Sequence, residues 1–129
     1  MEVPVLSGPV RGRRWVVGAG DHGCWLGWYE RDKAKLLAAA LITGSVFYDV
    51  GANVGFYSLL GAACVGFGGR VIAFEPVPEN LVILQKHIAM NQLANVMVIP
   101  AAVSDSVWRL PVPGRCCQHD WVPEHGGQP

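Results

Sequence analysis

The feature that most constrains the fold is a short apolar segment followed by a glycine-containing loop and a longer apolar segment. Residues 46–50 read Val-Phe-Tyr-Asp-Val, the composition of a central strand that is covered on both faces. Gly51 and Gly55 then allow backbone conformations that a Cβ atom would forbid. Residues 54–65 form one apolar run, long enough for a helix packed on the sheet. A strand, loop and helix in this order place free N–H groups at the carboxyl edge of a sheet, where such folds bind ligands.

A second segment of the same kind follows. After a turn at Gly68-Gly69, residues 71–75 read Val-Ile-Ala-Phe-Glu, which predicts another apolar strand that ends in a carboxylate. Glu75 lies 20 residues after Gly55, about where an acid at the end of the second strand binds ribose hydroxyls. Two parallel strands that each end in an acid, joined by a helix, predict half of a nucleoside pocket.

The loop favours one nucleoside cofactor over another. The dinucleotide motif G-x-G-x-x-G uses its second glycine to bring the backbone close to a pyrophosphate. Here residues 51–55 read Gly-Ala-Asn-Val-Gly, with a side chain at that second position and a different spacing. Asp49 would also repel a pyrophosphate, whereas it suits a ligand with positive charge, such as the amino and sulfonium groups of S-adenosylmethionine. Electrostatics therefore favours S-adenosylmethionine over NAD.

Three separated motifs resemble those of one enzyme family. Residues 47–58, 69–76 and 101–105 occur in order and with the spacing of an FkbM-type methyltransferase. The resemblance covers roughly residues 12–108. It implies a class I methyltransferase fold, S-adenosylmethionine as the methyl donor, and usually a hydroxyl acceptor on a small molecule or a sugar.

The residues and the resemblance together define a predicted cofactor site. Asp49 is expected near the methionine end and Glu75 on the ribose, and Ala101-Ala102-Val103 either lies against adenine, with Asp105 near its N6, or is only a strand end and turn. No catalytic base is predicted; His22 is considered, but a packing role for its loop is favoured. The predicted cofactor-binding residues are Asp49, Gly51, Ala52, Asn53, Gly55, Glu75, Pro76, Ala102 and Val103.

The chain divides into three predicted parts. Residues 1–29 form an N-terminal extension with a short strand at 15–17, interpreted as an aromatic flap that covers the sheet rather than as a lid. Residues 30–108 form the Rossmann-like half-domain that binds S-adenosylmethionine. Residues 109–129, broken by proline, form an irregular tail.

Two further helices and a third strand complete the predicted half-domain. Residues 30–42 form a helix with a solvent-facing charged first turn and an apolar stripe of Leu36, Leu37, Ala40 and Leu41. A second helix begins near Pro78, with His87 on its surface, and residues 96–99 form the third strand. The predicted fold is an open, incomplete α/β sheet of three parallel strands in the order 3-2-1. Its first strand is left as an exposed edge that could pair with another chain.

Composition excludes some partners and locations. The 129 residues contain 10 Lys and Arg and 10 Asp and Glu, so the chain has no basic field for nucleic acid. No apolar run reaches the length of a membrane span, and we expect a cytoplasmic protein. The four cysteines are expected to be reduced, and no metal site is predicted. A metal group is conceivable but disfavoured against an irregular tail; its residues would be Cys116, Cys117, His119 and His125.

Two functions remain open. The first is methyl transfer from S-adenosylmethionine to a hydroxyl group. The second is a truncated, non-catalytic fragment that binds a nucleoside or an interaction partner without turnover, because no second half of the fold is visible in the sequence.

Overall fold

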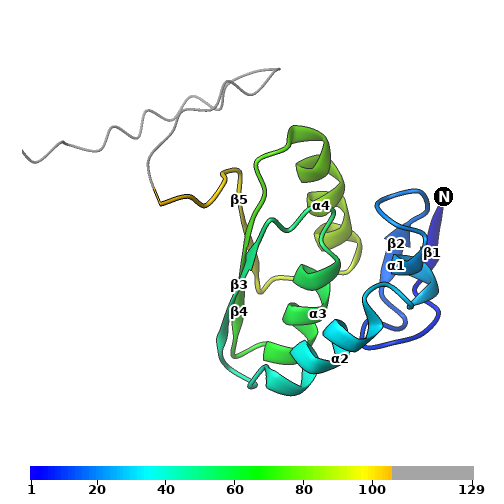
Figure 1. The fold of residues 1–129 in the computed structure, drawn as a ribbon, viewed down its shortest axis with the longest axis horizontal. Helices are drawn as coiled ribbons and strands as arrows, with labels where there is room; N and C mark the ends of the chain where they lie inside the picture. The colour runs from blue at the N-terminus through cyan, green and yellow to red at the C-terminus, as the bar shows by residue number, and fades with distance from the viewer. Residues whose placement is uncertain (106–129) are drawn as a thin grey trace, which may run out of the picture.

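A three-stranded parallel sheet forms one outer layer of the protein in the computed structural model, which describes residues 1–105 (Figure 1). Its strands are β3 (Val46–Val50), β4 (Arg70–Phe74) and β5 (Val96–Ile99). They lie in the order β3-β4-β5, with Asp49 beside Ala73 and Ala73 beside Val98. The predicted parallel sheet and its strand order are confirmed.

Three helices cover one face of this sheet (Figure 1). They are α2 (Arg31–Ala40), α3 (Phe56–Val65) and α4 (Pro78–Met90). Side chains alternate along a strand, so Val71 and Ala73 point to the helices and are fully buried against them. Both helices that connect consecutive strands lie on this face, so the apolar core forms between α3, α4 and the sheet.

The opposite face of the sheet carries apolar side chains that remain exposed. Val46, Tyr48 and Val50 are 52%, 60% and 58% exposed, and Met97 on β5 is also exposed. The prediction that residues 46–50 are covered on both faces is therefore wrong. The composition is that of a buried strand, but within residues 1–105 every helix that packs on the sheet lies on the other face.

The N-terminal segment packs on the helices and not on the sheet. Its strands β1 (Glu2–Pro4) and β2 (Arg14–Val16) pair antiparallel, and a short helix α1 (Gly23–Leu26) follows. Trp15 is fully buried and meets Phe56 of α3 edge to face, with ring centroids 6.3 Å apart. The predicted short strand is present, but the expectation that this flap covers the sheet is wrong, because α3 and α4 lie between them (Figure 1).

Helix α2 and its end bury only half of the predicted stripe: Leu37 and Leu41 pack against the core, whereas Leu36 and Ala40 do not. Leu36 is 72% exposed and Ala40 is exposed, whereas Ala34 is buried and Leu37 and Ala38 are half-buried. Positions 34, 37 and 38 share one face at helical spacing, so the true contact face is rotated from the predicted one. A run of leucine and alanine supports either face, and packing against α3 decides between them.

His87 is fully buried, so its predicted surface position is wrong. The flap packs over this side of α4, and its presence there was not foreseen. The proposed tail, residues 109–129, and the end of the half-domain at 108 lie outside the described residues, as do Cys116, Cys117, His119 and His125. Within residues 1–105, no helix is both long and apolar enough to cross a membrane.

Candidate functional site

The loop between β3 and α3 contains three residues with positive φ angles and lies over the end of β4. Gly51, Asn53 and Gly55 have φ angles of 76°, 51° and 97°. The N–H groups of Gly51 and Ala52 both donate to the carbonyl of Phe74 at 2.9 Å, and this fixes the loop to the neighbouring strand. Glycine adopts such angles freely and asparagine tolerates them better than most residues, so this sequence suits this loop.

The carboxylate of Glu75 joins the loop to the start of α4. Its Oε2 accepts a hydrogen bond from the Asn53 N–H at 2.7 Å. Its Oε1 accepts from the Val77 N–H at 2.9 Å and from Asn80 Nδ2 at 3.2 Å. Glu75 is 4% exposed, yet an ionised carboxylate accepts about four hydrogen bonds. It therefore retains capacity for one more donor, such as a ribose hydroxyl.

Asp49 lies beside the loop as a second buried acid, 7% exposed. Ser58 Oγ, on the first turns of α3, donates to its Oδ2 at 2.6 Å. Burial raises the pKa of Asp49, the hydrogen bond from Ser58 lowers it in part, and the charge of Glu75 raises it further. A cation bound next to this carboxylate would offset the cost of burying its charge.

A pocket of about 360 Å³ lies between the loop and the flap. Asp49, Gly51, Ala52 and Asn53, all predicted cofactor residues, line one side of it. The charged groups in its lining are the three acids Asp21, Glu30 and Asp49; the described lining contains no Lys, Arg or His. The pocket is therefore negatively charged and suits a cationic ligand.

The flap supplies pocket residues that the sequence analysis did not assign. Gly20, Asp21, Cys24 and Tyr29 line the pocket opposite the loop. The charged turn that starts α2 was interpreted as solvent-facing, which is wrong for Glu30, because it is half-buried in the lining. The polar and aromatic run at residues 21–25 was the signal that pointed to this wall, but polarity alone did not show which element the flap would contact.

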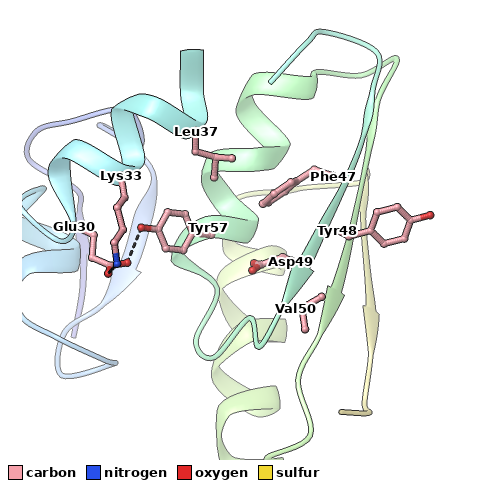
Figure 2. Close-up of a pocket in the computed structure, with 8 residues that line it drawn as sticks. All are labelled: Glu30, Lys33, Leu37, Phe47, Tyr48, Asp49, Val50 and Tyr57. Carbon is pink, nitrogen blue, oxygen red and sulfur yellow. Dashed lines mark hydrogen bonds and ion pairs between the residues drawn. The ribbon is translucent and has the colours of Figure 1, made fainter. Parts of the chain in front are cut away.

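A groove of about 500 Å³ adjoins this pocket, between α2 and β3 (Figure 2). Glu30, Asp49, Val50 and Tyr57 line both depressions. The Tyr57 hydroxyl donates to Glu30 Oε2 at 2.6 Å, and Lys33 forms an ion pair with the same carboxylate. The hydrogen bonds from Lys33 and Tyr57 lower the pKa of Glu30, whereas burial and Glu30 raise the pKa of Tyr57. At neutral pH the pair is therefore a carboxylate and a neutral phenol.

The remaining predicted residues lie around this centre. Gly55 begins α3, and Pro76 follows Glu75 and is half-buried. Ala102 and Val103 are exposed beyond the end of β5, one strand further from β3, and do not line the pocket. Asp49, Gly51, Ala52 and Asn53 thus line the pocket, and Glu75 contacts the loop through the Asn53 N–H. Gly55, Glu75, Pro76, Ala102 and Val103 lie outside the pocket lining.

A metal site, a reactive thiol and a catalytic histidine were each considered for residues 1–105. No group of three or more His, Cys, Asp or Glu within residues 1–105 is placed to hold a metal ion. Burial raises the pKa of the Cys24 thiol to about 11, so this pocket cysteine is protonated at neutral pH. His22 is exposed and lies outside the pocket lining.

Three features define the fold class of this chain. They are the order of the strands, the loop at the carboxyl edge of the sheet, and an acid at the carboxyl end of each of two consecutive strands. This is the Rossmann-like α/β fold of class I methyltransferases, as predicted, represented here by three strands. No protein-family model matches the sequence, and no curated protein sequence matches it. The assignment of the fold therefore comes from solved structures.

Three solved structures illustrate the similarity. An S-adenosylmethionine-dependent methyltransferase from Aquifex aeolicus is 30% identical over 54% of this chain and 38% of its own, with a TM-score of 0.51. A protein from Clostridium thermocellum described as an rRNA methylase is 19% identical over 55% of this chain and 39% of its own, with a TM-score of 0.53. A precorrin-6y C5,15-methyltransferase from Geobacter metallireducens GS-15 is 20% identical over 55% and 38%, with a TM-score of 0.50. This chain thus spans less than two fifths of the length of each.

Proposed function

We propose that this chain binds S-adenosylmethionine and forms the donor-binding part of a methyltransferase. The observation that carries the proposal is the position of two buried acids, Asp49 and Glu75, on either side of a loop with three positive φ angles. The acidic lining of the adjoining pocket supports the same cofactor: Lys33 offsets the charge of Glu30, but Asp21 and Asp49 remain, and S-adenosylmethionine carries amino and sulfonium cations. The solved methyltransferase structures share this fold and support the choice.

The residues present suit this cofactor. A Cβ atom added at Gly51 would meet nothing within 4 Å, so there is free space above the loop. Asp49 would lie near the methionine end, with Gly51, Ala52, Asn53 and Gly55 as the loop beneath it. Glu75 and Pro76 would hold the ribose side; contact of Ala102 and Val103 with adenine would require the ligand to extend beyond the pocket lining to the end of β5. When bound, S-adenosylmethionine supplies an electrophilic methyl group; the protein contributes chiefly its orientation toward the acceptor.

We further propose a hydroxyl on a small molecule or sugar as the acceptor, following the resemblance of the motifs to FkbM-type enzymes. The groove lined by Lys33, Leu37 and Tyr57 lies next to Asp49 and combines polar with apolar groups, as a site for such an acceptor would. The Clostridium and Geobacter proteins are described as acting on rRNA and on a precorrin, so the fold alone does not choose the acceptor class. The absence of a nucleic-acid partner and the cytoplasmic location stay predictions.

Calorimetric titration with S-adenosylmethionine and S-adenosylhomocysteine tests the donor site. Asp49→Asn keeps an oxygen for the Ser58 hydroxyl and removes the charge, so we expect about tenfold weaker binding of S-adenosylmethionine. The loss should be smaller for S-adenosylhomocysteine, which has no sulfonium charge. Asp32→Asn, on the exposed side of α2, is the matched control and should bind like the wild type.

Failure to bind either compound, in a protein shown to be folded, would contradict the proposed donor site. NAD serves as a negative ligand, and binding of NAD equal to that of S-adenosylmethionine would also contradict it.

A second function is nucleoside binding without turnover. The observation that favours it is that, within residues 1–105, one face of the three-stranded sheet carries exposed apolar side chains, so the described fold is open on that side. Transfer of a labelled methyl group, assayed with hydroxyl acceptors and with RNA, separates the two functions. Sustained turnover by the purified chain would exclude the non-catalytic alternative.

A further inference from the structure

His87 lies where three parts of the molecule meet, and none of the proposed cofactor contacts uses it. It is fully buried on α4, between the flap strand β2 and the loop that follows β3. Its ring stacks on Trp15, with centroids 4.0 Å apart and planes inclined by 22°. Both nitrogens of so deeply buried an imidazole require hydrogen-bond partners.

The backbone supplies both partners and determines where the hydrogen of the ring lies. Nε2 is 3.0 Å from the Val16 nitrogen, whose N–H can only donate, so Nε2 must accept. Nδ1 is 2.7 Å from the Val54 carbonyl oxygen, which can only accept, so Nδ1 must donate. These two contacts require a neutral ring with its hydrogen on Nδ1.

Asn91 extends the same contact along β2. Its Oδ1 accepts from the Arg14 N–H at 2.7 Å, and its Nδ2 donates to the Arg14 carbonyl at 2.9 Å. Four residues of a helix advance about 6 Å and two residues of a strand about 6.6 Å, so His87 and Asn91 match Val16 and Arg14 in spacing. Helix α4 therefore holds β2 by its backbone, as a neighbouring strand would.

The two backbone partners of His87 belong to opposite walls of the pocket. Val54 lies in the loop and lines the pocket itself. Val16 ends β2, shortly before Gly20 and Asp21, where the pocket lining on the flap side begins. One side chain thus connects the wall made by the loop to the wall made by the flap.

We propose that His87 is a positioning residue for the cofactor site, in that its neutral ring holds the flap and the loop at the separation that S-adenosylmethionine requires. This inference rests on the proposed function. Protonation would place a second hydrogen on Nε2, facing the Val16 N–H, and two opposed donors would release the flap from α4. Acidification should therefore weaken cofactor binding. Burial lowers the pKa of His87, the bond to Val54 raises it, and Lys86 lowers it, in agreement with a ring kept neutral.

The charged groups around His87 come from the flap and from α4. Glu2 on β1 pairs with Arg14 on β2 at 2.8 Å and with Lys86 on α4 at 3.4 Å. Residues 50–65, which include the loop and α3, contain no charged side chain. Variants at position 87 retain all of these charged groups. Any effect of these groups on the pH dependence of binding is therefore the same in the variants and in the wild type.

Two substitutions at this position separate hydrogen bonding from titration. In His87→Gln, the amide oxygen can accept from Val16 and the amide nitrogen can donate to Val54, but the side chain does not titrate. His87→Leu keeps an apolar body and removes both hydrogen bonds. Gln85→Leu, at an exposed position of the same helix, is the matched control.

The measurement is the affinity for S-adenosylhomocysteine, by calorimetry, at pH 7.5 and pH 5.5. We expect the wild type to bind several-fold more weakly at pH 5.5. His87→Gln should lose the part of this pH dependence that comes from the imidazole, whereas the part that comes from Asp49 is the same in both proteins. At pH 7.5, His87→Leu should bind about tenfold more weakly and Gln85→Leu should match the wild type. The nitrogen chemical shifts of the His87 ring should show its hydrogen on Nδ1 at pH 7.5.

Several results would overturn the inference: His87→Leu binding as tightly as the wild type, His87→Gln keeping the full pH dependence, or a ring with its hydrogen on Nε2. If His87→Leu does not fold, the pH dependence of His87→Gln and the chemical shifts of the wild-type ring still test the inference. A folded wild type that does not bind would instead overturn the proposed function. Amide hydrogen exchange then tests whether His87 connects the flap to the loop. Faster exchange in both residues 14–24 and residues 51–55 of His87→Leu would support this connection. A change in only one of the two segments would overturn it.

Discussion

Asp49 is a carboxylate with little contact to water and one strong donor, the Ser58 hydroxyl at 2.6 Å. Burial raises its pKa above the ordinary value of 3.8. A carboxyl whose pKa is higher in the folded than in the unfolded protein binds more protons when folded. Its contribution to the free energy of unfolding therefore falls as pH rises from 3.8 through the folded pKa. Ser58 limits this loss, because its hydrogen bond stabilises the ionised form.

Ser58→Ala should therefore destabilise the protein in a pH-dependent manner. We expect the free energy of unfolding to fall by about 1–3 kcal/mol at pH 7.5, where Asp49 is ionised and lacks its donor. The loss should shrink at pH 4.5, because the pKa of Asp49 rises further in the variant and the carboxyl takes up a proton. Urea denaturation at the two pH values measures both effects.

Ser45→Ala is the control for this experiment. The Ser45 hydroxyl donates to the neutral carbonyl of Ile42 at 2.6 Å, so its loss should cost the same at both pH values. An equal loss for Ser58→Ala at the two pH values would show that the charge of Asp49 is not involved.

Glu75 has a structural role in addition to its proposed contact with ribose, and this affects how its variants are interpreted. Its two oxygens bind the loop at Asn53 and the first turn of α4 at Val77 and Asn80. Removing the side chain would release the loop even without any ribose contact. Weaker cofactor binding in a Glu75 variant therefore does not by itself show contact with a ribose, whereas Asp49→Asn preserves the fold of the site.

At the level of elements, α3 approaches β3 closely because of Gly61. A Cβ atom built at Gly61 would lie 2.3 Å from Cδ1 of Phe47. Alanine is favoured over glycine inside a helix by about 1 kcal/mol, but overpacking of this kind costs about 1–3 kcal/mol. We therefore expect the cost of overpacking to exceed the gain in helix propensity.

Gly61→Ala is therefore expected to lower the free energy of unfolding by about 1–2 kcal/mol, measured by urea denaturation. Gly68→Ala is the control, since a Cβ there meets only Gly44 Cα, at 3.9 Å. A stabilised Gly61→Ala protein would mean that Phe47 moves away without cost and that helix propensity dominates.

The sequence was sufficient to predict the strands and helices of the half-domain, but not β1, α1 or all of the contacts between elements. The strand at 46–50, the loop and Glu75 carry local signals, namely apolar runs, glycines and a spacing of 20 residues, and these were enough to predict the strand, the loop and the acid at the carboxyl edge of the sheet. Which face of α2 is buried depends on packing against α3, and the leucine and alanine run permits two faces. The burial of His87 and the position of Glu30 in the pocket depend on where the flap docks, which no local pattern encodes.

At the scale of the whole molecule, the exposed sheet face is the main apolar surface described. It includes Val46 and Tyr48 on β3 and Met97 on β5, and the register places Tyr48, Ile72 and Met97 in one row. Contiguous apolar surface of this kind favours association between copies, as does the outer edge of β3, which pairs with no other strand within residues 1–105.

Val46→Lys combined with Met97→Lys should reduce self-association of the purified protein. We expect less concentration-dependent oligomer in sedimentation velocity, with the free energy of unfolding within about 1 kcal/mol of the wild type. Leu36→Lys combined with Val82→Lys, at exposed apolar positions on α2 and α4, is the control. An equal reduction in the control pair would show that added charge, and not the sheet face, is responsible.

The order of the strands also determines when each part of the site can form during synthesis. Each strand pairs with the next one in the sequence, β3 with β4 and β4 with β5, so every new strand meets a partner that has already left the ribosome. Glu75 emerges before β5 does, so the acceptor of the Asn53 N–H is available before the third strand is. His87 follows later and bonds to the flap, which was synthesised first. The two walls of the pocket are thus made early and are joined by a residue that arrives after both.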